Sequence, residues 1–182
     1  MAKTRPDKVE MGGLRLLLLR HAKSAWPEGV ADEERPLNGR GRAAAQLMGD
    51  YLAEMKLIPD LALVSTARRA QETWALVGER LPAQPETRNI AELYAASSGQ
   101  MLDVLQAVES ASRTVLILAH NPGMQDLALE LCGGGDAASR ESMAAKYPTA
   151  GLAVIDFPAA QWRDVGRGMG RLERFVTPRA LG

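Results

Sequence analysis

The chain has two histidines, and each directly follows an apolar segment. His21 ends the stretch LLLLRH, and His120 ends the stretch VLILAH. Arg20 precedes the first histidine, and the pair Arg68-Arg69 lies just beyond a third apolar stretch, LALVS. Guanidinium groups bind the non-bridging oxygens of a phosphoryl group, and a neutral imidazole is a competent nucleophile toward phosphorus. This set of residues indicates phosphoryl transfer in two steps through a covalent phosphohistidine.

Short apolar strands must bring these side chains together. Three runs have the length and composition of strands buried on both faces: Leu14–Leu19, Leu61–Val64 and Thr114–Leu118. Further elements are expected as helices at Ala43–Met55, Arg68–Leu81, Ser98–Ser110 and Pro122–Leu131, with strands at Gly151–Phe157 and Arg171–Thr177. The alternation predicts an α/β fold with an open, mainly parallel sheet covered on both faces. In such sheets polar groups gather beyond the carboxyl ends of the strands.

The composition of the chain excludes several kinds of function. With 182 residues the chain suits a single domain, predicted over 14–182, behind a flexible lead-in at 1–13. Lys plus Arg and Asp plus Glu are equal at 22 each, so no basic footprint for nucleic acid is present. Cys132 is the one cysteine, which excludes an internal disulfide and a cysteine-based zinc site. No run of about 18 apolar residues exists, and we expect a cytoplasmic protein without membrane contact.

Each of these residues also has a structural interpretation. A lone histidine after a strand is often a hydrogen-bonding group of the core, and Arg20 alone could form a surface ion pair. Neighbours on a helix point about 100° apart, so one of Arg68 and Arg69 is expected in solvent. A metal site is weakly supported, because the sequence has neither HxH nor HExxH and no acids cluster near the histidines. We therefore expect no metal and no cofactor.

Five blocks in order extend the pattern: LRHAKSAW, STARRAQET, ELYAAS, LAHNPG and YPTAG. Together they resemble the histidine phosphatase (phosphoglycerate-mutase-like) superfamily, and within it the small SixA-type phosphohistidine phosphatases. The resemblance covers roughly Leu14 to Pro178. It implies a three-layer αβα sandwich, which agrees with the pattern of strands and helices.

The resemblance assigns roles to individual residues. The Arg-His pair of the family falls on Arg20 and His21, with His21 as the phosphorylated nucleophile. The second arginine falls on Arg69, four residues before Thr73 of the same block, and the second histidine falls on His120. These four side chains, Thr73 aside, would form the phosphate pocket.

Two further positions depart from the family or follow it less closely. Ala119 replaces the glycine that usually precedes the second histidine, a change of one small residue for another. Asn38 stands where the family often has Ser or Thr, and we expect it to cap a helix and to lie near the substrate.

Glu92 is the position that best matches the general acid used by mutases and sugar phosphatases of the superfamily. Glu92 could instead be an exposed acid in an ion pair, with no catalytic role. The sequence does not decide between these two roles. An alkoxide is a poor leaving group that needs a proton from a positioned acid. An imidazole, with a pKa of about 6.5, leaves with little help. A phosphohistidine phosphatase could therefore work without Glu92.

Other residues near the motifs are assigned more modest roles. Lys23 is expected at the mouth of the site, where it could attract phosphate, and Trp26 is expected to pack into the protein. Gly151 is expected at a turn or a close backbone approach, and Cys132 is expected to be inert. The segment Cys132–Tyr147 is the longest candidate for a lid, and the lack of long insertions predicts an open site.

These observations predict a metal-independent phosphatase that acts on phosphohistidine in a protein, such as a histidine-containing phosphotransfer domain. A small-molecule phosphomonoesterase with the same pocket is the alternative enzyme. A non-catalytic phosphate-binding module and a mutase are further alternatives, and the mutase would need a closed site. Neither nucleic acid nor membrane is expected as a partner.

Overall fold

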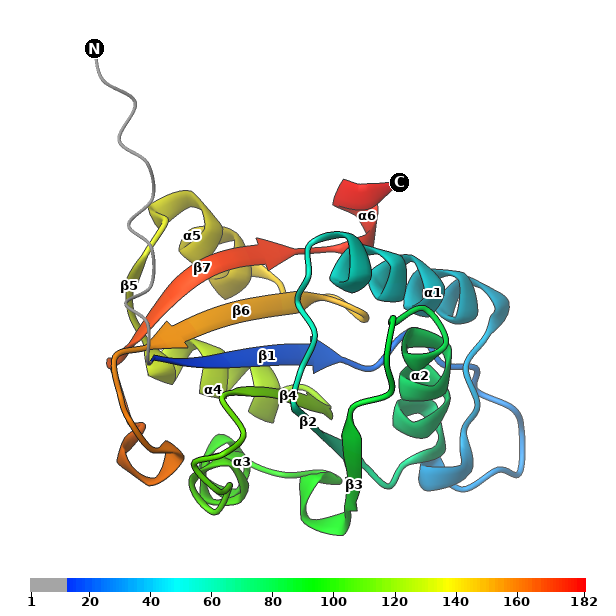
Figure 1. The fold of residues 1–182 in the computed structure, drawn as a ribbon. Helices are drawn as coiled ribbons and strands as arrows, with labels where there is room; N and C mark the ends of the chain where they lie inside the picture. The colour runs from blue at the N-terminus through cyan, green and yellow to red at the C-terminus, as the bar shows by residue number, and fades with distance from the viewer. Residues whose placement is uncertain (1–12) are drawn as a thin grey trace.

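A seven-stranded sheet forms the centre of the molecule (Figure 1). The computed structural model describes residues 13–182, so the lead-in predicted for 1–13 lies outside the described residues except for Gly13. The strand order is β3-β2-β4-β1-β6-β7-β5. The strands are β1 (Leu14–Arg20), β2 (Leu61–Ser65), β3 (Glu86–Ile90), β4 (Thr114–Ala119), β5 (Cys132–Gly135), β6 (Leu152–Phe157) and β7 (Gly170–Val176).

Strand β1 lies in the middle of the sheet, and its leucines are buried on both sides. Successive side chains of a strand point to opposite faces. Accordingly, Leu16 and Leu18 belong to one apolar cluster, and Leu17 and Leu19 belong to the other. All four are fully buried. The run of leucines in the sequence is thus explained by a strand that both layers of helices cover.

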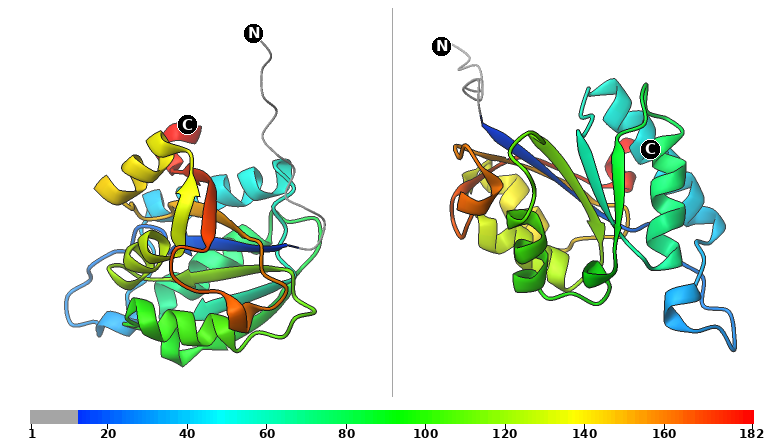
Figure 2. Two further views of the ribbon diagram at one scale, coloured as in Figure 1. Left: turned by 90° about the vertical axis from the view of Figure 1, so that its left-hand side faces the viewer. Right: turned by 60° about the horizontal axis from the view of Figure 1, so that its bottom comes forward.

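Helices cover the two faces of the sheet, so the predicted three-layer αβα arrangement is confirmed (Figure 2). Helices α1 (Gly39–Glu54) and α2 (Arg68–Gly78) pack against the Leu17 side, together with the short C-terminal α6 (Pro178–Leu181). Helices α3 (Ser98–Gln106) and α4 (Gly123–Leu131) pack against the Leu16 side. No helix within 13–182 is both long and apolar enough to cross a membrane.

The sheet is mainly parallel, as predicted, and β6 is the strand that runs against its neighbours. Strand β1 pairs with β4 in parallel and with β6 in antiparallel orientation. The register of the parallel pair sets Arg20 opposite Ala119, so His21 and His120 follow two adjacent strand ends. Because β6 is antiparallel, the segment that precedes it, 147–151, arrives at this same edge of the sheet.

The segment Cys132–Tyr147, the longest candidate for a lid, forms an edge strand of the sheet and a helix. Its first part is β5, an edge strand that pairs in parallel with β7. The second part is helix α5 (Ala137–Ala145), which packs through Met143 into the apolar cluster on the Leu16 side. Without β5, strand β7 would be an edge strand with unpaired backbone groups. Pairing with β5 satisfies those groups.

Helix α1 begins four residues earlier than the sequence suggested. The side chain of Asn38 accepts a hydrogen bond from the backbone of Gly41 at 2.8 Å and caps the helix. A Cβ atom at Gly41 would lie 2.0 Å from the carbonyl oxygen of Lys23. The glycine that lowers helix propensity is therefore what allows α1 to pack against the segment that follows His21.

Candidate active site

His21 lies at the carboxyl end of β1 with one ring nitrogen engaged and the other free to react. Its Nδ1 lies 2.8 Å from the carbonyl oxygen of Ala22. A carbonyl oxygen only accepts hydrogen bonds, so Nδ1 carries the proton and donates it. The lone pair is then on Nε2. Thr73 fixes this turn, because its hydroxyl accepts the Ala22 N–H at 3.0 Å and donates to the Arg69 carbonyl at 2.6 Å.

The His21 ring is held in its neutral form. Burial lowers the pKa of His21 to about 3, against a weaker opposing effect of the Ala22 carbonyl. The nearby charges of His120, Arg69 and Arg20 lower the pKa further. Burial therefore contributes more than the guanidinium groups that the sequence pointed to. A neutral imidazole is the nucleophilic form at pH values near 7.

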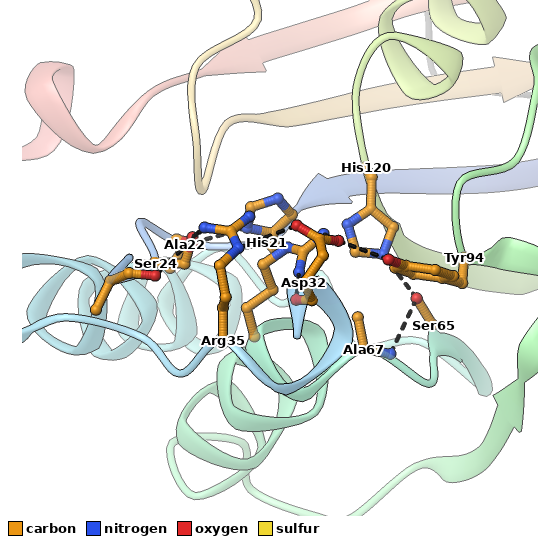
Figure 3. A network of polar contacts seen from close by, with 11 residues as sticks. His21, Ala22, Ser24, Asp32, Arg35, Ser65, Ala67, Tyr94 and His120 are labelled. Atoms are coloured by element: carbon orange, nitrogen blue, oxygen red, sulfur yellow. Dashed lines mark hydrogen bonds and ion pairs between the residues drawn. The ribbon is translucent and has the colours of Figure 1, made fainter. Parts of the chain in front are cut away.

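His120 faces His21, with 5.0 Å between the ring centroids (Figure 3). Its Nε2 lies 2.7 Å from the Ser65 hydroxyl oxygen, which also accepts the Ala67 N–H at 3.3 Å. When the Ser65 hydroxyl donates its proton to Nε2, the His120 proton lies on Nδ1. Burial, followed by the charge of Arg69, lowers the pKa of His120 to about 4.

Two arginines hold positions beside the histidines. Arg20 donates through Nη1 to the Tyr147 carbonyl at 2.8 Å. Arg69 donates to the backbone carbonyl of Asp32 at 2.7 Å and to its carboxylate at 3.1 Å. Arg69 is 6% exposed, whereas its neighbour Arg68 lies in solvent and pairs with Glu72. The expectation that one arginine of this pair lies in solvent is confirmed, and that residue is Arg68.

Three buried nitrogens at this edge of the sheet have no hydrogen-bond partner within residues 13–182. They are Nε of Arg20, Nε of Arg69 and Nδ1 of His120. Buried polar groups are rarely left without a partner unless a ligand or water serves them. As donors, these atoms match the oxygens of a phosphoryl group bound at His21.

The loop after His21 supplies residues that the sequence analysis did not select. The Asp32 carboxylate accepts from the Tyr94 hydroxyl at 2.6 Å and from Nε of Arg35 at 3.0 Å (Figure 3). The Tyr94 hydrogen bond is the largest cause that lowers the pKa of Asp32 to about 2. The Tyr94 ring meets His120 edge-on at 5.7 Å between centroids. Asp32 therefore ties three segments of the site together as an ionised group.

The sequence analysis could have selected Arg35, because this residue begins the stretch RPLN. Only Asn38 was selected from that stretch. The side chain of Arg35 is buried and bonds to the Ser24 hydroxyl at 2.7 Å. Its guanidinium carbon lies 3.5 Å from the centre of the Trp26 ring. The expectation that Trp26 packs into the protein was wrong, because the residue is 79% exposed and instead covers Arg35 from the outside.

The remaining selected residues do not join this cluster. Glu92 is exposed on the short 3-10 helix η2 (Ala91–Leu93) and lines a small hollow together with Arg88 and Val104. The side chain of Asn38 is used in capping α1. Lys23 is exposed and lines a groove next to the site.

Gly151 lies in the turn before β6, as expected, and this turn is hydrogen-bonded to the backbone of Arg20 and His21. The Gly151 N–H donates to the Pro148 carbonyl at 3.0 Å. The neighbouring Ala150 adopts a φ of 58° and donates its N–H to the carbonyls of Arg20 and His21, each at 3.1 Å. Cys132 is buried, and burial raises its pKa to about 11, so it stays a thiol.

The site places one nitrogen that can act as a nucleophile beside a set of buried hydrogen-bond donors. The neutral Nε2 of His21 can attack a phosphorus atom, and Arg20, Arg69 and His120 can hold the phosphoryl oxygens. The Asp32 carboxylate is ionised and bound to two arginines. Residues 13–182 contain no group of three or more His, Cys, Asp or Glu side chains arranged to hold a metal ion.

Comparison with known proteins adds an independent observation. A family model described as the histidine phosphatase superfamily (branch 1) matches residues 16–94, which include His21 and the arginine pair. An uncharacterized protein of Mycobacterium tuberculosis is 39% identical over 163 residues, which are 88% of this chain and 100% of that protein. The phosphohistidine phosphatase SixA of Escherichia coli is 29% identical over 123 residues, covering 66% of this chain and 76% of SixA.

A solved structure extends the similarity to the whole fold. It is that of a protein from Agrobacterium tumefaciens named after the phosphohistidine phosphatase SixA. The two chains share 31% identity with a TM-score of 0.77. The match covers 91% of this chain and 98% of the other.

Proposed function

Because the chain belongs to the histidine phosphatase superfamily, we propose that His21 carries the phosphoryl group of a covalent intermediate and that the substrate is phosphohistidine on a protein. The chain is a phosphatase; the intermediate and the substrate are the proposal. The observation that carries it is the neutral His21 ring, with a free Nε2, beside three buried nitrogens that lack partners within residues 13–182.

The first step transfers the phosphoryl group to the enzyme. The Nε2 lone pair of His21 forms a bond to phosphorus while the bond from phosphorus to the substrate imidazole breaks. The electron pair of that bond stays on the substrate nitrogen, and because the other nitrogen of the substrate ring carries a proton, the group leaves as a neutral imidazole. Arg20, Arg69 and His120 donate hydrogen bonds to the phosphoryl oxygens and stabilise their charge as the transfer proceeds.

The second step returns the enzyme to its starting form. A water oxygen forms a bond to phosphorus while the bond to Nε2 breaks, and the electron pair returns to the His21 ring. The water gives one proton to solvent, and inorganic phosphate leaves. The hydrogen bond from Nδ1 to the Ala22 carbonyl keeps the ring oriented through both steps.

The carboxylates of the site favour a nitrogen leaving group over an alkoxide. An alkoxide needs a protonated acid at the leaving atom. Asp32 is poorly suited, because the Tyr94 hydroxyl and the two arginines hold its pKa near about 2. Glu92 lies beside Arg88 and Val104 rather than among the histidines. An imidazole leaves without such an acid, because its own basicity is moderate.

Trapping the intermediate tests the proposal at its centre. We would incubate the protein with a protein carrying radiolabelled phosphohistidine, quench in alkali and separate the two chains. We expect a label on the enzyme that is stable in base and lost in acid, and no label on His21→Ala. A wild-type protein that turns substrate over yet never carries label on His21 would contradict the covalent mechanism.

A substrate comparison tests the leaving group. Wild type, Glu92→Gln and Asp32→Asn would be assayed with the phosphohistidine protein and with a panel of sugar and nucleoside monophosphates. We expect kcat/KM to be higher for phosphohistidine, and Glu92→Gln to leave this rate within about twofold, the size of an exposed substitution. Faster turnover of one metabolite, lost in Glu92→Gln, would instead identify a small-molecule phosphomonoesterase. Binding of phosphate without turnover of any substrate would identify a phosphate-binding module.

A further inference from the structure

A second surface feature lies next to the nucleophile and is not used by the chemistry above. It is a groove of about 710 Å³ between α1, α5 and the start of α6. Four basic side chains line it: Lys23, Arg40, Lys146 and Arg179. The other lining residues are small, such as Ala145, or uncharged, and no acidic residue is among them. We call these four side chains and their surroundings the basic groove.

The cations of the basic groove are not neutralised by the protein. All four side chains are exposed. Eight ion pairs within residues 13–182 engage eight different arginines, and none of the eight belongs to the groove. The chain as a whole is balanced at 22 acidic and 22 basic residues. A local excess of four positive charges in a balanced protein produces a field that attracts anions.

Both walls of the basic groove are attached to the nucleophile. Lys23 follows His21 by two residues, and its carbonyl accepts the Asn38 N–H at 3.0 Å, which holds it against the start of α1. On the other wall, the segment after Lys146 begins with Tyr147, whose carbonyl accepts a hydrogen bond from Arg20. A ligand in the groove would therefore lie beside the group that His21 attacks.

The chemistry of the lining separates the groove from a second phosphate pocket. The phosphate donors at His21 are buried nitrogens that come from the ends of β1 and β4 and from the first turn of α2. The groove cations come from four separate segments, are exposed, and include two of the five lysines of the chain. The groove cations are two lysines and two arginines, and each of these side chains can pair with a single carboxylate. The lining also includes Ala145 and Pro178, which offer apolar contact to a chain.

We propose that the basic groove binds acidic side chains of the protein substrate, namely aspartates and glutamates close to its phosphohistidine. This inference rests on the proposed function, since it describes the surroundings of the phosphohistidine that His21 attacks. The enzyme then recognises its substrate by two separate means. The buried site binds the phosphoryl group of any partner, and the groove selects the partner whose phosphohistidine has acidic neighbours.

A pair of peptides tests the recognition of acidic neighbours. Both carry a phosphohistidine, which is flanked on each side by glutamates in one peptide and by glutamines in the other. We expect wild type to show a KM about tenfold lower for the glutamate peptide at low ionic strength, as several exposed charge pairs would give. The double variant Lys146→Glu/Arg179→Glu should lose or reverse this preference.

A matched control carries the same change in charge elsewhere. Arg163 and Arg171 are exposed and lie outside the groove lining and outside every ion pair of residues 13–182. Arg163→Glu/Arg171→Glu should keep the preference of wild type for the glutamate peptide. An equal loss in this control would mean that net charge, and not the groove, sets the preference.

The outcomes separate the groove from the function on which it rests. Equal kcat/KM for both peptides in wild type would overturn the groove proposal and leave the phosphohistidine phosphatase intact. Failure to hydrolyse either peptide, while p-nitrophenyl phosphate is hydrolysed, would overturn the proposed function itself. A preference for a sugar bisphosphate over the monophosphate that is lost in Lys146→Glu/Arg179→Glu would assign the groove to a small substrate instead. Thermal unfolding of each variant checks that the fold is retained.

Discussion

Two adjacent regions of the molecule differ in how their positively charged side chains are held. In the cluster around His21, which we propose is the catalytic cluster, the guanidinium groups of Arg20, Arg35 and Arg69 are largely withdrawn from solvent and anchored by carbonyls, a hydroxyl or the Asp32 carboxylate. In the basic groove Lys146 and its neighbours project into solvent without an ion pair. The cluster around His21 holds its cations in place before the substrate binds, whereas the basic groove leaves its cations without ion pairs.

The difference corresponds to two tasks that one set of charges performs poorly. Stabilising a transition state requires donors that already have the right geometry, because reorganising them costs free energy at the moment of reaction. Attracting and selecting a partner requires only an exposed field that reaches into solvent. We therefore expect changes in the catalytic cluster to act mainly on kcat, and changes in the groove to act mainly on KM.

Replacing Arg69 should give the largest effect, and its neighbour provides the control. Arg69→Ala removes a buried donor from the phosphoryl site, and loss of one such donor lowers kcat by about 10² to 10³. Arg68→Ala removes an exposed side chain of the same type that pairs with Glu72, and should change kcat less than about twofold. Steady-state kinetics on the glutamate peptide compare the two. Similar losses in both would break the distinction between anchored and free cations.

Acid should destabilise the protein through the two buried histidines. Both titrate near about 6.5 in the unfolded chain, whereas folding lowers the pKa to about 3 for His21 and about 4 for His120. Below pH values of about 6.5 the unfolded state therefore binds more protons than the folded state, and the free energy of unfolding falls as the pH falls. We expect a decrease of about 2 to 4 kcal/mol between pH 7 and pH 5, measured by urea unfolding.

The same pKa values have a direct signature in NMR spectra. The chain has only two histidines, so both ring signals can be assigned with one variant, His120→Asn. Neither signal should move between pH values of about 8 and 5 in the folded protein. A ring that titrates near about 6.5 would show that the site is wetter and less anchored than the structure indicates.

Asp32→Asn tests whether this half-exposed carboxylate positions the arginines. The substitution keeps the shape of the side chain but weakens its bonds to Arg69, Arg35 and Tyr94. We expect kcat to fall about tenfold, as for loss of a charged hydrogen-bond network. Removal of the negative charge should at the same time tighten product inhibition by phosphate. A fall in kcat/KM with unchanged kcat would place Asp32 in substrate binding instead.

Much of this arrangement could be predicted from the sequence because strands are periodic and parallel neighbours end together. The alternation in Leu16–Leu19 and the two strand-end histidines needed no knowledge of the loops. Asp32 and Tyr94 were missed because they reach the site through irregular segments, whose path follows from tertiary contacts rather than from a repeating pattern. Trp26 was misjudged for a related reason. Its hydrophobicity suggested burial, while the cation beside it stabilises an exposed position.

Salt should give the smallest effect and should separate the two regions within one protein. The Debye length falls from about 14 Å at about 50 mM salt to about 4 Å at about 500 mM, so exposed charges are screened while buried ones are affected much less. For the glutamate peptide we expect KM to rise about fivefold over this range and kcat to change less than about twofold. The glutamine peptide, measured in parallel, should show almost no change in KM. A kcat that falls with salt as steeply as the affinity would mean that the catalytic arginines are as exposed to solvent ions as Lys146 and Arg179, and the contrast between anchored and free cations would not hold.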